Sequence, residues 1–318
     1  EKIEWFGARY VKTPGCESNV KEIYDAPNEL RKDPKNRIMN QFEEFGNYRF
    51  HYYCTGNSCI EVAAELAEKS IGNGRIAGFA SAMGSAGTIA AGERIKHEFH
   101  DARTIGVEPI QCPTLYWNGY GGHDIQGIGD KHVTWIHNVF EMDAITCVDD
   151  IECTKGLQVL TEEAGWKTLA GRYGVPETSI REMSEIMGIS GVCNVLACIK
   201  AAKFYGLRES DSMFTIATDT MDRYGSVMKQ LDETYGAMDE TEAAVRTASI
   251  FHKAGTDWFS EGTQHAKQSW FNLKYYTWVE QQGKTVEELD AQRDPEFWLS
   301  EQAKIEQNDR LLREARGW

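Results

Sequence analysis

Residues 75–90 read RIAGFASAMGSAGTIA, and this stretch decides the fold. Residues 75–82 form a nearly continuous apolar run, which is typical of a strand covered on both faces. Small residues and glycines follow at 84–88, and a helical pattern then runs over 88–99. A buried strand, a short glycine-containing turn and a helix together indicate the beginning of a βαβ unit.

Similar segments recur on both sides of this stretch. We expect further strands at 8–13, 104–108, 144–148 and 213–218, and helices at 60–69 and 192–205. Ser18 or Asn19 is expected to cap a helix that runs through Val20. The alternation predicts an α/β fold with an open, mostly parallel twisted sheet and helices on both faces.

The character of the sequence changes after about residue 231. Residues 232–318 show no convincing strand pattern and are rich in Glu, Gln and Ala with embedded aromatic residues. We expect a helical C-terminal extension whose aromatic side chains anchor a core or a subunit interface.

Composition limits the classes of partner. The 318 residues carry 34 Lys and Arg against 49 Asp and Glu, a formal net charge of −15. This charge argues against nucleic acid as a partner, because phosphate binding needs clustered basic residues. No apolar run approaches the ~20 residues that span a bilayer, so no membrane partner is expected. The hydrophobic content of 41% excludes a disordered chain.

Eight cysteines are too few for a disulfide framework in a chain of this length. No pair has C-x-x-C spacing, so no metal site is predicted. We expect buried, reduced thiols and a cytoplasmic location.

The turn after the apolar run has the features of a phosphate-binding loop. Glycines let backbone N–H groups approach an anion, and the helix N-terminus adds favourable partial charge. The hydroxyls of Ser85 and Thr88 can add further donors. It is not a P-loop, and it lacks the G-x-G-x-x-G spacing of dinucleotide binders. An ordinary tight turn between strand and helix remains the alternative.

Several segments in order resemble the cysteine synthase/cystathionine β-synthase family of fold type II pyridoxal-phosphate enzymes. The resemblance covers roughly residues 6–228. It rests on the turn GSAGT at 84–88, on QF at 41–42 before HY at 51–52, on IQGIG at 125–129 and on TMDRY at 220–224. The segment from 271 to 283 resembles a longer branch of cysteine-synthase-like proteins.

The resemblance implies pyridoxal 5'-phosphate as the cofactor and a small amino acid as the substrate. It assigns the cofactor phosphate to Gly84, Ser85, Ala86, Gly87 and Thr88. Thr220 would hydrogen-bond the pyridine nitrogen, a neutral partner that suits β-elimination and β-replacement. It assigns the substrate to Gln41, Gly127, Ile128 and Gly129. A homodimer is expected, as is usual in the family.

One departure concerns the Schiff-base lysine, which in the family lies in a motif before the strand matched by 8–13. No residue of these 318 matches it, and Lys32 follows the wrong helix. Every lysine is interpreted as a solvated surface charge. We therefore expect an N-terminally incomplete chain without a catalytic residue, inactive alone. The expected division is 1–40 as the remainder of a small mobile domain, 41–231 as the large cofactor-binding domain and 232–318 as the extension.

The predicted function is a β-elimination or β-replacement on a Ser-, Cys- or O-acylserine-like amino acid. A serine/threonine dehydratase-like lyase on the same fold is one alternative. A non-catalytic subunit whose turn binds an anion is another. The residues His51, His123 and His132 are interpreted as structural rather than as acid/base groups.

Overall fold

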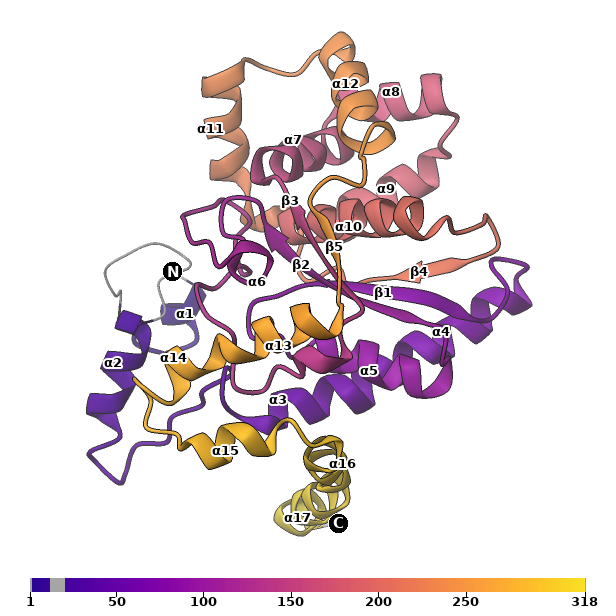
Figure 1. Ribbon diagram of the computed structural model, residues 1–318. Helices are drawn as coiled ribbons and strands as arrows, with labels where there is room; N and C mark the ends of the chain where they lie inside the picture. Colours follow the sequence, from indigo (N-terminus) through magenta and orange to yellow (C-terminus); the bar gives the residue numbers. More distant parts are fainter. Residues whose placement is uncertain (1, 12–20, 318) are drawn as a thin grey trace.

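The computed structural model describes residues 2–11 and 21–317 (Figure 1). Its strands are β1 (Ile76–Ala82), β2 (Arg103–Pro109), β3 (Ala144–Val148), β4 (Ser212–Phe214) and β5 (Phe259–Glu261). They form one sheet in the order β4-β1-β2-β3-β5. β1 pairs in parallel with β2 and β4, and β2 pairs in parallel with β3. The predicted mostly parallel sheet is therefore confirmed.

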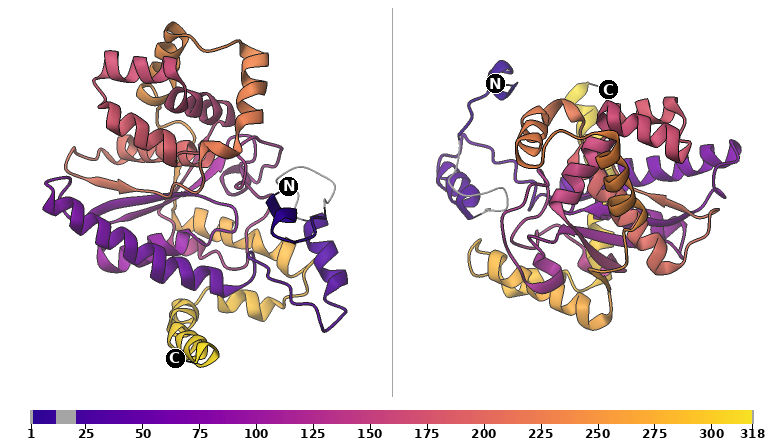
Figure 2. Two further views of the ribbon diagram at one scale, coloured as in Figure 1. Left: turned by 180° about the vertical axis from the view of Figure 1, so that it is seen from behind. Right: turned by 90° about the horizontal axis from the view of Figure 1, so that it is seen from above.

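Helices cover both faces of this sheet, as predicted (Figures 1 and 2). One face carries α4 (Gly56–Glu68) and α5 (Ile89–Glu98), and the other carries α7 (Asp150–Thr161) and α10 (Ile189–Tyr205). The remaining elements before β5 are α1 (Lys2–Trp5), α2 (Lys21–Leu30), α3 (Phe45–Phe50), η1 (His51–Thr55), α6 (Thr114–Trp117), η2 (Val139–Glu141), α8 (Glu163–Tyr173), α9 (Glu177–Ile186), η3 (Met221–Arg223), α11 (Gly225–Tyr235), α12 (Glu240–Arg246) and η4 (Thr247–His252).

The central strands are buried because their residues are apolar on both faces. Phe79, Ile105 and Cys147 are fully buried, as the continuous apolar runs predict. α10 packs across the sheet with an apolar face that includes Val192 and Leu196. The expected helix at 192–205 begins three residues earlier, at Ile189.

The expected strand at 8–13 is wrong for its described part. Residues 8–11 have no strand structure, and Tyr10 and Val11 are 59% and 64% exposed. A strand requires a neighbour for its hydrogen bonds, and no strand among the described residues pairs with 8–11. The proposed caps Ser18 and Asn19 lie outside the described residues.

The region after residue 231 does contain a strand, so that part of the prediction is wrong. β5 pairs antiparallel with β3, with Ser260 opposite Ile145. The expected boundary at 231 falls inside α11. The helices that follow β5 are α13 (Gln264–Asn272), α14 (Lys274–Trp278), α15 (Val286–Ala291), α16 (Pro295–Ala303) and α17 (Ile305–Arg316).

Several aromatic side chains of the C-terminal segment belong to the core. Trp270, Phe271 and Trp278 pack in one cluster with Val133 and Trp135. The indole N–H of Trp278 donates to the backbone oxygen of Val133 over 2.8 Å. A buried indole with its N–H satisfied contributes both apolar contact and specificity of position.

Candidate functional site

The turn at 84–88 lies between the carboxyl end of β1 and the start of α5. In parallel α/β sheets, ligands bind at this edge of the sheet. Ala86 and Gly87 are buried, whereas Gly84, Ser85 and Thr88 are partly exposed. The partly exposed residues include Ser85 and Thr88, whose hydroxyls are the phosphate donors expected from the sequence.

Asn47, on α3, holds the turn in place. Its side-chain amide donates to Ser85 Oγ and to the backbone oxygen of Gln41, each over 2.9 Å. A Cβ added at Gly87 would lie 2.3 Å from Asn47 Oδ1 and 2.8 Å from a ring carbon of His51. Gly87 is thus needed for the close approach of α3 to the turn.

The loop at 125–129 lies against the other side of the turn. The amide of Gly129 donates to the backbone oxygen of Met83 over 2.8 Å. A Cβ on Gly84 would lie 3.0 Å from the backbone oxygen of Gly127. Ile128 and Gly129 are buried, and Gly127 is exposed. Two segments that the resemblance assigns to one site are therefore in contact.

The backbone of the turn has free donors. Among the described residues, no acceptor pairs with the amides of Gly84, Ser85, Ala86 or Thr88. The amide of Gly87 makes only a 3.4 Å contact with Ser85 Oγ. Unpaired amides at a helix N-terminus fit a phosphate group, which accepts several hydrogen bonds.

Thr220 lies near the same edge of the sheet but is not joined to the turn. Asn194 accepts from the amide of Ala82 over 2.7 Å and donates to the backbone oxygen of Ile216 over 2.8 Å. This bridge places the segment after β4 beside the end of β1. The Thr220 hydroxyl donates to Asp222, and no hydrogen bond within the described chain links Thr220 with residues 84–88.

Gln41 lies beyond Asn47, on a surface groove of about 790 Å³. The side chain of Gln41 is exposed, and its backbone oxygen is the atom that contacts Asn47. The structure therefore brings the backbone of Gln41 to the turn but leaves its side chain on the groove.

One carboxyl group lies close to the turn. Asp130 Oδ2 would be 3.9 Å from a Cβ on Gly84 and has no hydrogen-bond partner in the described residues. Burial raises the pKa of Asp130 to about 7. Its negative charge is thereby reduced near neutral pH, which limits its repulsion of an anion at the turn.

The three histidines are each held by a hydrogen bond. His51 Nδ1 is 2.9 Å from Thr55 Oγ1, His123 Nε2 is 3.2 Å from the backbone oxygen of Gly129, and His132 Nε2 is 3.0 Å from the Tyr24 hydroxyl. Burial lowers the pKa of His132 to about 4, so its imidazole is neutral at physiological pH.

The interpretation of every lysine as a surface charge is wrong for two of them. Lys200 is 6% exposed, and Lys274 is fully buried. Lys274 Nζ donates to the backbone oxygen of Trp135 and to Gln292 Oε1. Burial holds the pKa of Lys274 well below its usual range. These bonds join the start of α14 to Trp135 and to Gln292, and neither partner belongs to the turn.

Three residues that hold the turn or the adjoining end of β1 were not selected from the sequence as site residues: Asn47, Thr134 and Asn194. Thr134 Oγ1 donates to the backbone oxygen of Ser85 over 2.7 Å. The sequence does mark Asn194, because it is a polar residue inside an apolar helical run. Nothing in the local sequence marks Thr134, because its partner is 49 residues away.

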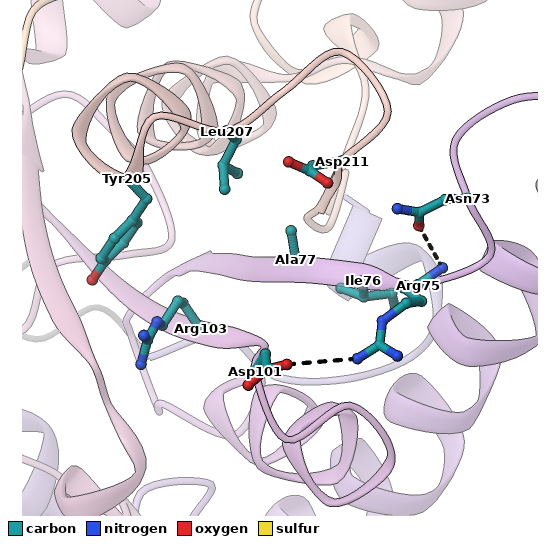
Figure 3. Close-up of a pocket in the computed structure, with 9 residues that line it drawn as sticks. All are labelled: Asn73, Arg75, Ile76, Ala77, Asp101, Arg103, Tyr205, Leu207 and Asp211. Carbon is teal, nitrogen blue, oxygen red and sulfur yellow. Dashed lines mark hydrogen bonds and ion pairs between the residues drawn. The ribbon is translucent and has the colours of Figure 1, made fainter.

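A separate pocket of about 450 Å³ lies at the amino ends of the strands (Figure 3). Arg75, Asp101, Arg103 and Tyr205 are among the residues that line it. The pocket and the turn lie at opposite ends of the strands, because β1 begins at Ile76 and the turn follows Ala82.

No group of three or more His, Cys, Asp or Glu side chains in the described ranges is placed to hold a metal ion. No single helix in those ranges is long and apolar enough to cross a bilayer, although the sharply bent pair α9 and α10 passes that test jointly.

Comparison with known proteins agrees with this geometry. No family model matches the chain. Cysteine synthase B of Campylobacter jejuni is 27% identical over 224 residues, which cover 70% of this chain and 64% of the relative. A cysteine synthase of Staphylococcus aureus is 26% identical over 224 residues, with 70% and 62% coverage. The chain thus spans less than two thirds of the length of these relatives.

Comparison with solved structures identifies the fold. An O-acetylserine sulfhydrylase of Entamoeba histolytica superposes with a TM-score of 0.55 and 25% identity, covering 78% of this chain and 64% of the other. A hydrogen sulfide-producing enzyme of Fusobacterium nucleatum gives 0.57 and 22%, with 77% and 65% coverage. The fold is that of the fold type II pyridoxal-phosphate enzymes. By sequence, the chain is similar to the cysteine synthases over 224 residues.

Proposed function

We propose that this chain belongs to a pyridoxal-phosphate-dependent enzyme that performs β-elimination or β-replacement on a Ser-, Cys- or O-acylserine-like amino acid. The observation that carries the proposal is the turn at 84–88, which presents unpaired amides at the carboxyl end of β1. Its relation to the cysteine synthases supports the choice of reaction.

The residues of the turn would hold the cofactor by its phosphate. The amides of Gly84, Ser85, Ala86 and Thr88 are the donors, and Asn47 keeps Ser85 in position. Pyridoxal phosphate, when bound, supplies an electron sink for the α-carbon of an amino acid. The neutral hydroxyl of Thr220 would face the pyridine nitrogen, and Gln41, Gly127, Ile128 and Gly129 would border the substrate.

Binding of the cofactor tests the proposal directly. We expect pyridoxal phosphate to change the absorbance of the purified chain saturably, and pyridoxal, which lacks the phosphate, to bind at least ~10-fold more weakly. Ser85→Asp places a carboxylate at the turn and should abolish binding, whereas the neutral Ser85→Asn serves as the matched control. Equal affinity for pyridoxal and pyridoxal phosphate would contradict the assignment of the turn.

Turnover is a separate measurement. Incubation with O-acetylserine and sulfide should yield no cysteine from these 318 residues, because no lysine matches the Schiff-base position of the family. Cysteine formation by this chain would show that one of its own lysines fills that role.

A further inference from the structure

A small cavity lies between α5 and the C-terminal segment, with a volume of about 220 Å³. Its walls include the buried polar side chains of Glu93, Asn138 and Gln292, the rings of Phe140 and Trp298, and Leu299 at the surface. Glu93, Asn138 and Gln292 are 3%, 5% and 0% exposed. The proposed catalytic function makes no use of any of these residues.

Two of the buried polar groups have no partner. Asn138 Oδ1 and Gln292 Nε2 make no hydrogen bond with any described residue. Their orientation is set by their other ends, since Asn138 Nδ2 donates to Glu93 over 3.2 Å and Gln292 Oε1 accepts from Lys274 over 2.6 Å. A buried unpaired polar atom costs about 1–3 kcal/mol, so a molecule that pairs with both atoms is favoured.

Glu93 adds a third binding group. Its Oε2 accepts from the Tyr48 hydroxyl and from Asn138, whereas its Oε1 accepts, among the described side chains and amides, only from Gln302 over 2.9 Å. A carboxylate oxygen accepts two hydrogen bonds, so one position on Oε1 is free. Glu93 has no ion pair among the described residues, and burial raises its pKa to about 8. Arg293 also lines the cavity, but its guanidinium pairs with Asp290 over 3.0 Å. A further cation in the cavity would stabilise the ionised form of Glu93.

We propose that this cavity binds a small primary ammonium compound that carries an oxygen on a neighbouring carbon, as amino alcohols and amino acids do. The ammonium group donates to Glu93 Oε1 and Asn138 Oδ1. The oxygen accepts from Gln292 Nε2. An ammonium group has three donors and no acceptor, which matches the acceptors of Glu93 and Asn138. The rings of Phe140 and Trp298 cover the carbon atoms of the compound.

Calorimetric titration of the full chain tests this site. Ethanolamine represents the amino alcohols and glycine represents the amino acids. Binding of either compound supports the proposal. Propylamine lacks the oxygen and ethylene glycol lacks the charge, so each should bind at least ~10-fold more weakly. Failure of both ethanolamine and glycine to bind, or equal binding of propylamine, overturns the proposal.

Leu299→Trp locates the binding. Leu299 lines the cavity and is 46% exposed, so a larger ring fills the cavity without disturbing the polar groups. We expect at least a tenfold loss of affinity. Leu312→Trp, at a 57% exposed position on α17, is the matched control and should bind as the wild type does. Unchanged affinity in Leu299→Trp overturns the site. If that variant does not fold, the unfolding temperature of the wild type decides, because ethanolamine or glycine must raise it and propylamine must not.

Discussion

Replacement of Gly87 by alanine is the sharpest test of how the turn is built. The new Cβ would lie 2.3 Å from Asn47 Oδ1 and 2.8 Å from His51. Asn47 would have to move, which breaks its two hydrogen bonds to Ser85 and Gln41. Each bond contributes about 1 kcal/mol, and overpacking adds about 1–3 kcal/mol. We expect the free energy of unfolding to fall by about 3–5 kcal/mol.

Urea denaturation followed by tryptophan fluorescence and circular dichroism measures this loss. Gly46→Ala is the matched control on α3, because a Cβ at Gly46 meets no atom within 4 Å. That variant should change the free energy of unfolding by less than about 1 kcal/mol. If Gly87→Ala is no less stable than Gly46→Ala, the close contact between Asn47 and the turn is not a feature of the protein.

Three further substitutions test other parts of the structure. Burial raises the pKa of Glu108 from its ordinary 4.5 to about 8, so the stability that this carboxyl group contributes is present below pH 4.5 and is lost as the pH rises to 8. In the wild type, this loss makes the free energy of unfolding fall with pH by up to about 1.4 kcal/mol per pH unit between pH 4.5 and 8. Glu108→Gln should remove that part of the pH dependence, and urea denaturation at several pH values measures it. Trp278→Ala should lower the free energy of unfolding by about 3–5 kcal/mol, since this side chain is fully buried. The control Tyr276→Ala, at a 58% exposed position, should lower it by less than about 1 kcal/mol. Thermal melting compares the two variants. Ala86 has a φ of +61°, so Ala86→Gly should stabilise the protein by roughly 1 kcal/mol in the same assay, and a lower melting temperature would contradict the left-handed conformation.

The sequence predicted the central sheet because its strands are buried on both faces. The runs at 75–82, 104–108 and 144–148 became β1, β2 and β3 with shifts of one residue or none. In these strands the pattern of apolar residues is a direct consequence of burial, so it can be read locally. The expected strand at 213–218 is shorter, since only Ser212–Phe214 pair with β1.

Long-range contacts account for what the sequence missed. β5 has only three residues, and its pairing with β3 depends on a partner more than 100 residues earlier. Asn47 and Thr134 act on Ser85 from distances of 38 and 49 residues in the chain. Lys274 has the composition of a surface residue, and only its contacts with Trp135 and Gln292 explain its burial. The roles of Thr220 and Gln41 stay predictions.

The pairing of β5 with β3 bears on how the polypeptide can be shortened. Because Phe259–Glu261 complete the outer side of the sheet, a version that stops at residue 231 would expose the backbone donors and acceptors of β3. Unpaired strand edges recruit other chains. Such a shortened protein should therefore self-associate and precipitate during expression, even with every residue of the turn at 84–88 retained.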